Sequence, residues 1–200
     1  MTGVLKAVLA CLVAGALTGP VAGSAAARWA TGQAIRLWID PRHAPVGGDA
    51  LVHRAMQMWV EASAGRLAYV RTSRQQDATM RVRFVTNGAG LYGGTGAHVD
   101  PETRAIAEAD VMIAGDAGSD PLERHIIIYL TALHEFGHAL GLKHTDDFAS
   151  IMYQFSRPGD CERYFTGYRA RLQSADDIGS ANATGLSATD IATLRELYDR

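Results

Sequence analysis

Cysteine and proline are scarce in this 200-residue sequence, and its charges nearly cancel. Two cysteines, Cys11 and Cys161, allow at most one disulfide bond, which excludes the dense covalent framework of small secreted scaffolds. The 19 basic and 21 acidic side chains give a formal net charge of −2. Because a domain that binds nucleic acid normally carries a surplus of basic residues, we expect no nucleic-acid partner.

Beyond the N-terminal region, the sequence also lacks an apolar run of the roughly 20 residues that a transmembrane helix needs. The apolar stretch at residues 7–17 is too short to span a bilayer. It follows Lys6 and precedes the small residues Ala25 to Ala27, as in a secretory signal peptide. We therefore expect cleavage of residues 1–27, no stable membrane anchor, and an extracellular or periplasmic protein. Residues 28–200 have the length of one domain, which we expect to be a monomer.

The most informative segment is residues 134–144, His-Glu-Phe-Gly-His-Ala-Leu-Gly-Leu-Lys-His. It fits the pattern H-E-x-x-H-x-x-G-x-x-H, which supplies three imidazoles and one carboxylate. On a helix, His134 and His138 project from the same face and can bind one zinc ion. Gly141 can adopt a left-handed conformation that ends the helix and returns His144 as the third ligand. A lone core histidine is more often a satisfied polar group, but three of the seven histidines lie in this segment.

The same segment predicts catalysis as well as metal binding. Three protein ligands leave a fourth position open, whereas structural zinc sites usually close all four positions with protein groups. Glu135 follows the first ligand, so its carboxylate can lie near the metal without binding it. That placement suits a general base acting on a water that zinc activates.

A second element extends this pattern to a known clan. Met152, in the run Ser-Ile-Met-Tyr at residues 150–153, lies eight residues after His144 and resembles the Met-turn beneath the zinc of metzincin metallopeptidases. Within that clan the chain is most similar to a bacterial, matrixin-like catalytic domain of the peptidase M10 type, in which a tyrosine also follows the methionine directly. Tyr153 is therefore not expected to bind zinc. The chain departs from the matrixin pattern at Thr145 and Gln154, where serine and proline are usual.

The resemblance implies an α+β, zincin-like fold with a twisted mixed sheet, mostly parallel, together with an active-site helix, a backing helix and a C-terminal helix. The residue pattern gives the elements themselves. Short strands are expected at residues 35–39, 67–71, 80–85, 97–99 and 109–114. Helices are expected at residues 49–65, from Asp120 through the zinc motif, and after Ser187.

The resemblance also points to substrate-binding residues. An extended peptide would pair with the edge strand at Ala97, His98 and Val99, and Tyr153 is a further candidate contact. The glycine-rich stretch 93–96 is explained as well by an ordinary loop as by a part in the substrate cleft. The long connection between Tyr153 and Ser187 would wall the pocket for the residue after the scissile bond, or else form a surface insertion or a short extra helix.

Matrixins also carry structural zinc and calcium sites. His98, Asp100 and Asp110 are the possible remnants of such sites here, but without a full ligand set they are better explained as ordinary loop and strand-end residues. One catalytic Zn²⁺ is therefore the cofactor that the sequence predicts, and structural Zn²⁺ or Ca²⁺ is left open.

Together these observations predict a secreted zinc endopeptidase that hydrolyses internal bonds of proteins or peptides, with Glu135 as the general base. Two alternatives belong to other classes: a secreted binding or adhesion module that keeps zinc as a structural element, and a zinc hydrolase with a non-protein substrate. Glu135 argues against the first alternative, because a purely structural site has no use for a base. The family resemblance is the main argument against the second.

Overall fold

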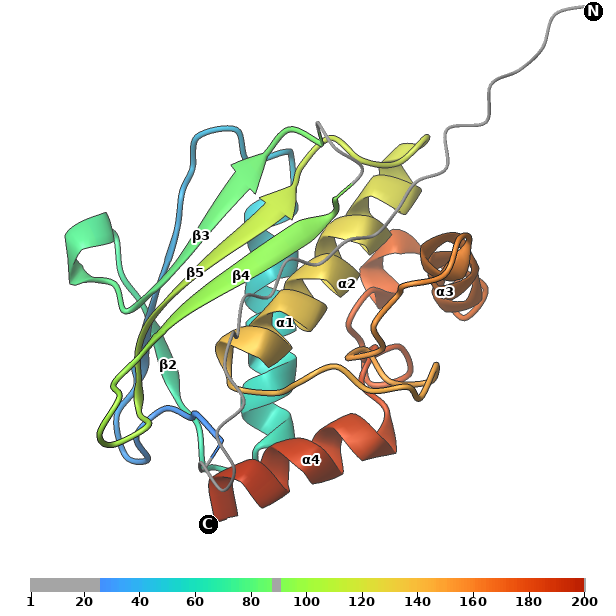
Figure 1. Cartoon of the computed structure of the whole chain (residues 1–200). Helices are drawn as coiled ribbons and strands as arrows, with labels where there is room; N and C mark the ends of the chain where they lie inside the picture. Colours follow the sequence, from blue (N-terminus) through green and yellow to red (C-terminus); the bar gives the residue numbers. More distant parts are fainter. Residues whose placement is uncertain (1–25, 88–90, 200) are drawn as a thin grey trace, which may run out of the picture.

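A computed structural model of the protein describes residues 26–87 and 91–199. Five strands form one twisted sheet in the order β2-β1-β3-β5-β4, and the long helices lie on one of its faces (Figure 1). Strands β2, β1, β3 and β5 are parallel, and only β4 runs antiparallel to its neighbour β5. The expected α+β architecture with a mostly parallel mixed sheet is confirmed. Apart from Ala26 and Ala27, the predicted signal peptide at residues 1–27 falls outside the described residues.

The strands follow the apolar patterns of the sequence, although their bounds differ in places. In β3, Met80, Val82 and Phe84 are buried, while the alternate residues face away from the helices. The first and third strands have the expected bounds, the second is shorter than expected, and the fourth and fifth are longer. The bounds are β1 Ile35–Ile39, β2 Tyr69–Arg71, β3 Met80–Val85, β4 Gly93–Val99 and β5 Ile106–Ala114.

Strand β4 corrects the expected bounds most clearly. It begins at Gly93 rather than at Ala97, so the glycine-rich stretch is the first half of an edge strand and not a loop. Antiparallel pairing with β5, in register from Gly93 opposite Ile113 to His98 opposite Glu108, overrides the low strand preference of glycine.

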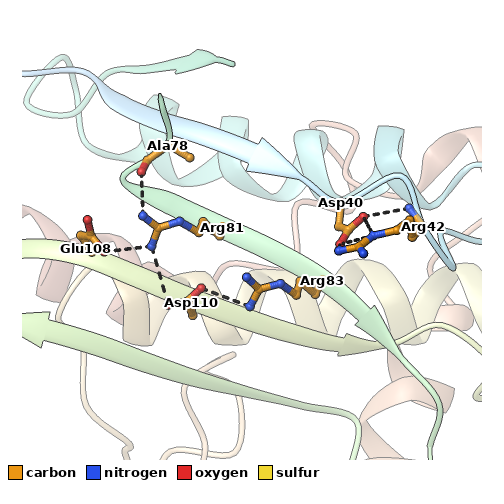
Figure 2. Close-up of polar contacts among 7 residues, drawn as sticks. All are labelled: Asp40, Arg42, Ala78, Arg81, Arg83, Glu108 and Asp110. Carbon is orange, nitrogen blue, oxygen red and sulfur yellow. Dashed lines mark hydrogen bonds and ion pairs between the residues drawn. The ribbon is translucent and has the colours of Figure 1, made fainter. Parts of the chain in front are cut away.

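Charged side chains cover the face of the sheet that points away from the helices. Arg81 on β3 contacts Glu108 on β5 at 2.9 Å, and Arg83 lies 3.4 Å from Asp110 (Figure 2). These pairs lie across neighbouring strands and are partly open to solvent, so each contributes little to stability. They keep this face polar and leave the helical side of the sheet as the side that buries the apolar core.

Helices α1 (Gly48–Ala62) and α2 (Pro121–Ala139) form that core with the sheet. The cap of α2 is as predicted, since Asp120 accepts a hydrogen bond from Glu123 N. The start of α1 differs: Gly47, with φ of 79°, is the N-cap, and Asp49 lies in the first turn. The fully buried Trp59 joins the two helices by donating from Nε1 to the carbonyl of Leu133 at 2.8 Å.

Two further helices complete the fold. The connection after the Met-turn contains α3 (Asp160–Arg169), and α4 (Ala188–Asp199) begins after Ser187 as expected. Single 3₁₀ turns lie at Gln75–Asp77 and Ala175–Asp177. Within the described part of the chain, none of the helices combines the length and apolarity that crossing a bilayer requires.

Residues 27–30 tie together elements that are far apart in sequence. Trp29 is 6% exposed, and its Nε1 donates to the carbonyl of Ala139 at the end of α2 at 2.8 Å. Its backbone N–H bonds to the hydroxyl of Tyr198, which donates in turn to the carbonyl of Leu140. Arg28 bridges to the β4–β5 hairpin at Ala105. This segment therefore holds the end of the zinc-motif helix against α4 and the sheet.

We predict that Trp29→Ala lowers the free energy of unfolding by about 3–5 kcal/mol, because it empties a buried aromatic site and leaves a carbonyl without its partner. Urea denaturation of the metal-free protein measures this loss. A change below about 1 kcal/mol would show that the segment is not integral to the fold.

Candidate metal centre and active site

The structure brings the three motif histidines together. Their Nε2 atoms are separated by 3.2 Å between His138 and His134, 3.0 Å between His138 and His144, and 3.4 Å between His144 and His134. No other group of histidine, cysteine, aspartate or glutamate side chains in the described residues has comparable metal-holding geometry. For a tetrahedral ion with zinc–nitrogen bonds of 2.0–2.1 Å, neighbouring ligand nitrogens should lie about 3.3 Å apart. The spacing observed here fits zinc.

The other ring nitrogens fix the tautomers. His134 Nδ1 lies 2.6 Å from the carbonyl of Ile151, and His138 Nδ1 lies 3.0 Å from the carbonyl of Leu142. Because a carbonyl can only accept, both Nδ1 atoms carry the proton and donate it. The Nε2 lone pairs of these two rings are then turned toward each other without protons. Such an arrangement is unfavourable by itself and becomes favourable around a cation.

Burial keeps these imidazoles neutral. His134 is 5% exposed, and burial, with the nearby His138 and His144 adding to it, lowers its pKa to about 3. Burial also lowers the pKa of His138 to about 4 and shifts that of His144 in the same direction. Neutral imidazole is the form that binds a metal, so the rings are ready to act as ligands at neutral pH.

Gly141 delivers the third histidine in the manner the sequence predicted. The helix ends at Ala139, and Gly141 adopts a left-handed conformation with φ of 99°. Leu142 N then donates back to the carbonyl of Gly137, which closes the turn. A side chain at position 141 would also collide with the carbonyl of Ala27, which lies 2.0 Å from the position of an added Cβ.

Glu135 is buried beside the ligands and is held under strand β4. It is 1% exposed, and Thr95 Oγ1 lies 2.7 Å from its Oε2. Burial raises the pKa of Glu135 to about 7, while the hydrogen bond from Thr95 opposes this shift. A carboxyl group with a pKa near neutrality can both accept and return a proton, which is the property of a general acid–base.

Met152 forms a floor beneath the motif. It is 2% exposed, and its backbone N–H donates to Ser150 Oγ at 2.9 Å. An added Cβ at Gly137 would lie only 2.2 Å from Met152 Sδ, so the methionine packs directly against the helix backbone between the two helical histidines. Thr145 N donates to the carbonyl of Met152, which connects this turn to the segment that carries His144.

Asp190 on α4 anchors the turn, a role that the sequence analysis did not assign. It is 2% exposed, its Oδ1 accepts from Ser150 Oγ, and its Oδ2 accepts from Ile151 N at 3.1 Å. Ser187 donates to the same carboxylate through both its backbone and its hydroxyl. The sequence shows this aspartate only as part of a helix start. Its second function depends on a contact across about 40 positions of the chain.

An apolar cavity of about 40 Å³ opens beside His134 and Glu135. Tyr92 and Gly93 line one side, and the rings of Tyr164 and Phe165 from α3 line another. Phe155 completes the wall, and its ring centroid lies 5.8 Å from that of His134. Phe155 has φ of 47°, a left-handed conformation that is costly for an aromatic residue and that sequence patterns do not reveal.

The remaining predicted site residues are more dispersed. Tyr153 is 8% exposed and does not line the cavity, because its ring packs between Phe148 and Phe155. On β4, Gly93 and Thr95 approach Glu135, Ala97 and His98 are exposed beyond them, and Val99 is half-buried against the core.

The possible remnants of structural metal sites do not gather. Asp110 pairs with arginines on the outer face of the sheet, and Asp100 accepts hydrogen bonds within its own turn from Glu102 and Thr103. His98 is exposed on the edge strand. The three side chains therefore do not converge on a common metal site.

We predict that Gly137→Ala lowers the free energy of unfolding by about 1–3 kcal/mol and weakens zinc affinity, because the new methyl group must displace the sulfur of Met152. Gly167→Ala is the matched control, since its Cβ would meet nothing within 4 Å on helix α3. That substitution should be neutral or stabilise the protein by up to about 1 kcal/mol. Denaturation and chelator competition measure the two effects, and equal behaviour of both variants would refute the packing argument.

Comparison with known proteins agrees with this geometry. The sequence model of the family described as Matrixin (Peptidase_M10) matches residues 40–179. A probable matrix metalloproteinase 095L of Invertebrate iridescent virus 3 is 31% identical over 144 residues, which cover 66% of this chain and 38% of the relative. Interstitial collagenase of Equus caballus is 32% identical over 144 residues, 68% of this chain and 27% of the relative. Metalloendoproteinase 1 of Glycine max is 25% identical over 112 residues, which cover 51% of this chain and 36% of the relative.

The chain thus spans well under half the length of these relatives. The match nevertheless includes the zinc motif, the Met-turn and helix α3, and the resemblance inferred from the motif is confirmed. The chain belongs to the matrixin family.

Proposed function

We propose that this protein is a zinc-dependent endopeptidase that hydrolyses internal peptide bonds of proteins or peptides. The observation that carries the proposal is the triangle of Nε2 atoms, 3.0–3.4 Å apart, with the buried carboxylate of Glu135 on the same helix. Membership of the matrixins supports the reaction class. We further propose that residues 1–27 direct secretion and that residues 28–200 form the catalytic domain.

In the proposed mechanism, His134, His138 and His144 hold the zinc ion through Nε2. When bound, zinc supplies Lewis acidity toward water and toward the scissile carbonyl. Glu135 accepts the proton of the attacking water and afterwards delivers it to the leaving amine. The hydrogen bonds from His134 and His138 to backbone carbonyls keep both rings oriented during these steps.

The open edge of β4 and the apolar cavity support a peptide as the substrate. An edge strand presents unpaired backbone groups that an extended peptide can pair with. The cavity beside Glu135 is lined by aromatic and aliphatic side chains and has room for a small apolar side chain. We propose that it takes the side chain following the scissile bond, with helix α3 setting the preference.

The two other classes of function are less well supported. A structural zinc module would not need a buried carboxylate beside an open coordination position. Burial of Glu135 lowers the stability of the fold, and a catalytic role explains why the residue is nevertheless buried there. A zinc hydrolase of non-protein substrates would share the chemistry. Such a hydrolase, however, would give the edge strand next to Glu135 no role in binding substrate.

We predict that Glu135→Gln reduces peptide hydrolysis at least about 100-fold while one zinc ion per chain is retained, because the amide cannot accept the proton. His138→Ala should lose both zinc and activity. Zinc analysis of the purified variants and mass spectrometry of a digested peptide library measure these outcomes. Undiminished cleavage by Glu135→Gln would remove the general base from the mechanism.

Phe165→Ala should enlarge the cavity and shift the preference at the residue after the cut toward bulkier apolar side chains. Phe165 packs edge-on against Tyr92, with ring centroids 5.3 Å apart, so its removal opens the wall between α3 and the start of β4. Phe148→Ala is the control, because Phe148 packs against Tyr164 of the same helix α3 without lining the cavity. If the two variants cut the peptide library with the same preference, Phe165 does not set specificity.

A further inference from the structure

Thr95 makes a contact with Glu135 that the zinc motif does not predict. Its Oγ1 lies 2.7 Å from Glu135 Oε2 and 2.9 Å from the backbone carbonyl of Glu135. The two residues belong to β4 and α2, so the bond crosses from the edge strand to the catalytic helix over 40 positions of sequence. Thr95 is half-buried and Glu135 is buried, which limits competition from water.

A hydroxyl group can donate only one proton at a time, and an ionised carboxylate is a stronger acceptor than a carbonyl. The terminal torsion of a glutamate side chain is broad, so its carboxylate plane is not fixed by rotamer preference alone. A hydrogen bond to one carboxylate oxygen supplies the missing restraint. In this site the bond from Thr95 holds Oε2 and leaves Oε1 to take a proton.

Gly93 provides the steric half of the same arrangement. An added Cβ at this position would lie 2.5 Å from Thr131 Cγ2, 2.9 Å from Glu135 Cγ and 3.0 Å from Glu135 Oε1. Gly93 and Thr95 are two residues apart on a strand and therefore face the same side of the sheet. Gly93 leaves room for the Glu135 side chain beneath β4, and Thr95 forms a hydrogen bond to the carboxylate at the end of that side chain.

We propose that Thr95 is a positioning residue for Glu135, and that with Gly93 it keeps the carboxylate in one orientation beside His134. The inference rests on the proposed function, in which Glu135 is the general base. Thr95 touches neither the metal ligands' Nε2 atoms nor, in the proposed mechanism, the reacting water. Its effect is therefore on the proton-transfer step rather than on zinc or substrate binding.

The test uses zinc-loaded Thr95→Val, which keeps the shape of threonine and removes the hydroxyl group. We expect kcat to fall about 10- to 100-fold, with KM and zinc content close to those of the wild type. Thr95→Ser keeps a hydroxyl group and should recover most of the lost kcat. The exposed Thr193→Val on α4 controls for the substitution itself. Unchanged kcat in Thr95→Val, or a loss confined to KM, would overturn the proposal.

Crystal structures of the metal-free variants give a readout that does not depend on activity. In Thr95→Val the Glu135 carboxylate should rotate away from its wild-type orientation, and in Thr95→Ser it should not. Gly93→Ala should displace the Glu135 side chain, whereas Gly94→Ala should not, because its Cβ makes an ordinary 3.6 Å contact with Met112. An unchanged Glu135 in both Thr95→Val and Gly93→Ala would also overturn the proposal.

These experiments distinguish failure of the Thr95 proposal from failure of the proposed endopeptidase function. If the wild type binds zinc and cuts peptides while Thr95→Val is equally active, only the role of Thr95 is lost. If the zinc-loaded wild type cuts no peptide in a mixed library, the proposed function fails. The positioning of Glu135 is then decided by the crystal structures alone.

Discussion

The hydrogen bond from His134 to the carbonyl of Ile151 is the contact on which the metal centre depends. It fixes the tautomer of the most deeply buried imidazole and connects helix α2 to the Met-turn. The turn is held in its own place by Asp190, which accepts from Ser150 and from Ile151 N. Each member of this chain of contacts orients the next, so the ring positions follow from α4 as much as from the zinc motif itself.

The sequence was sufficient for the parts of the site that are local. The spacing of His134 and His138 follows from helical geometry, and Gly141 adopts the left-handed turn that was expected from its place in the motif. Strand positions and the Asp120 cap were likewise predicted, since alternation and capping depend on residues near one another in the chain, whereas the mostly parallel sheet was expected from the family resemblance. Assignment to the matrixins rested on the same local signals, and the comparisons confirm it.

Non-local contacts account for what sequence reasoning missed. Nothing within a few residues of Asp190 or Thr95 indicates that they meet the Met-turn and Glu135, because those partners lie about 40 positions away. The strand over Gly93 was not foreseen, because glycine disfavours strands and only pairing with β5 stabilises it there. The left-handed backbone of Phe155 accompanies ring contacts with His134 and Tyr164, which composition does not encode.

The anchoring of the Met-turn by Asp190 has a consequence for how the protein matures. His134 and His138 lie on a single helix, but the residue whose carbonyl orients His134, Ile151, is held by Asp190 of α4. Loop-closure entropy makes contacts of such long sequence separation slow to form. The metal-binding geometry should therefore arise late in folding, so that a partly folded chain holds a metal ion weakly.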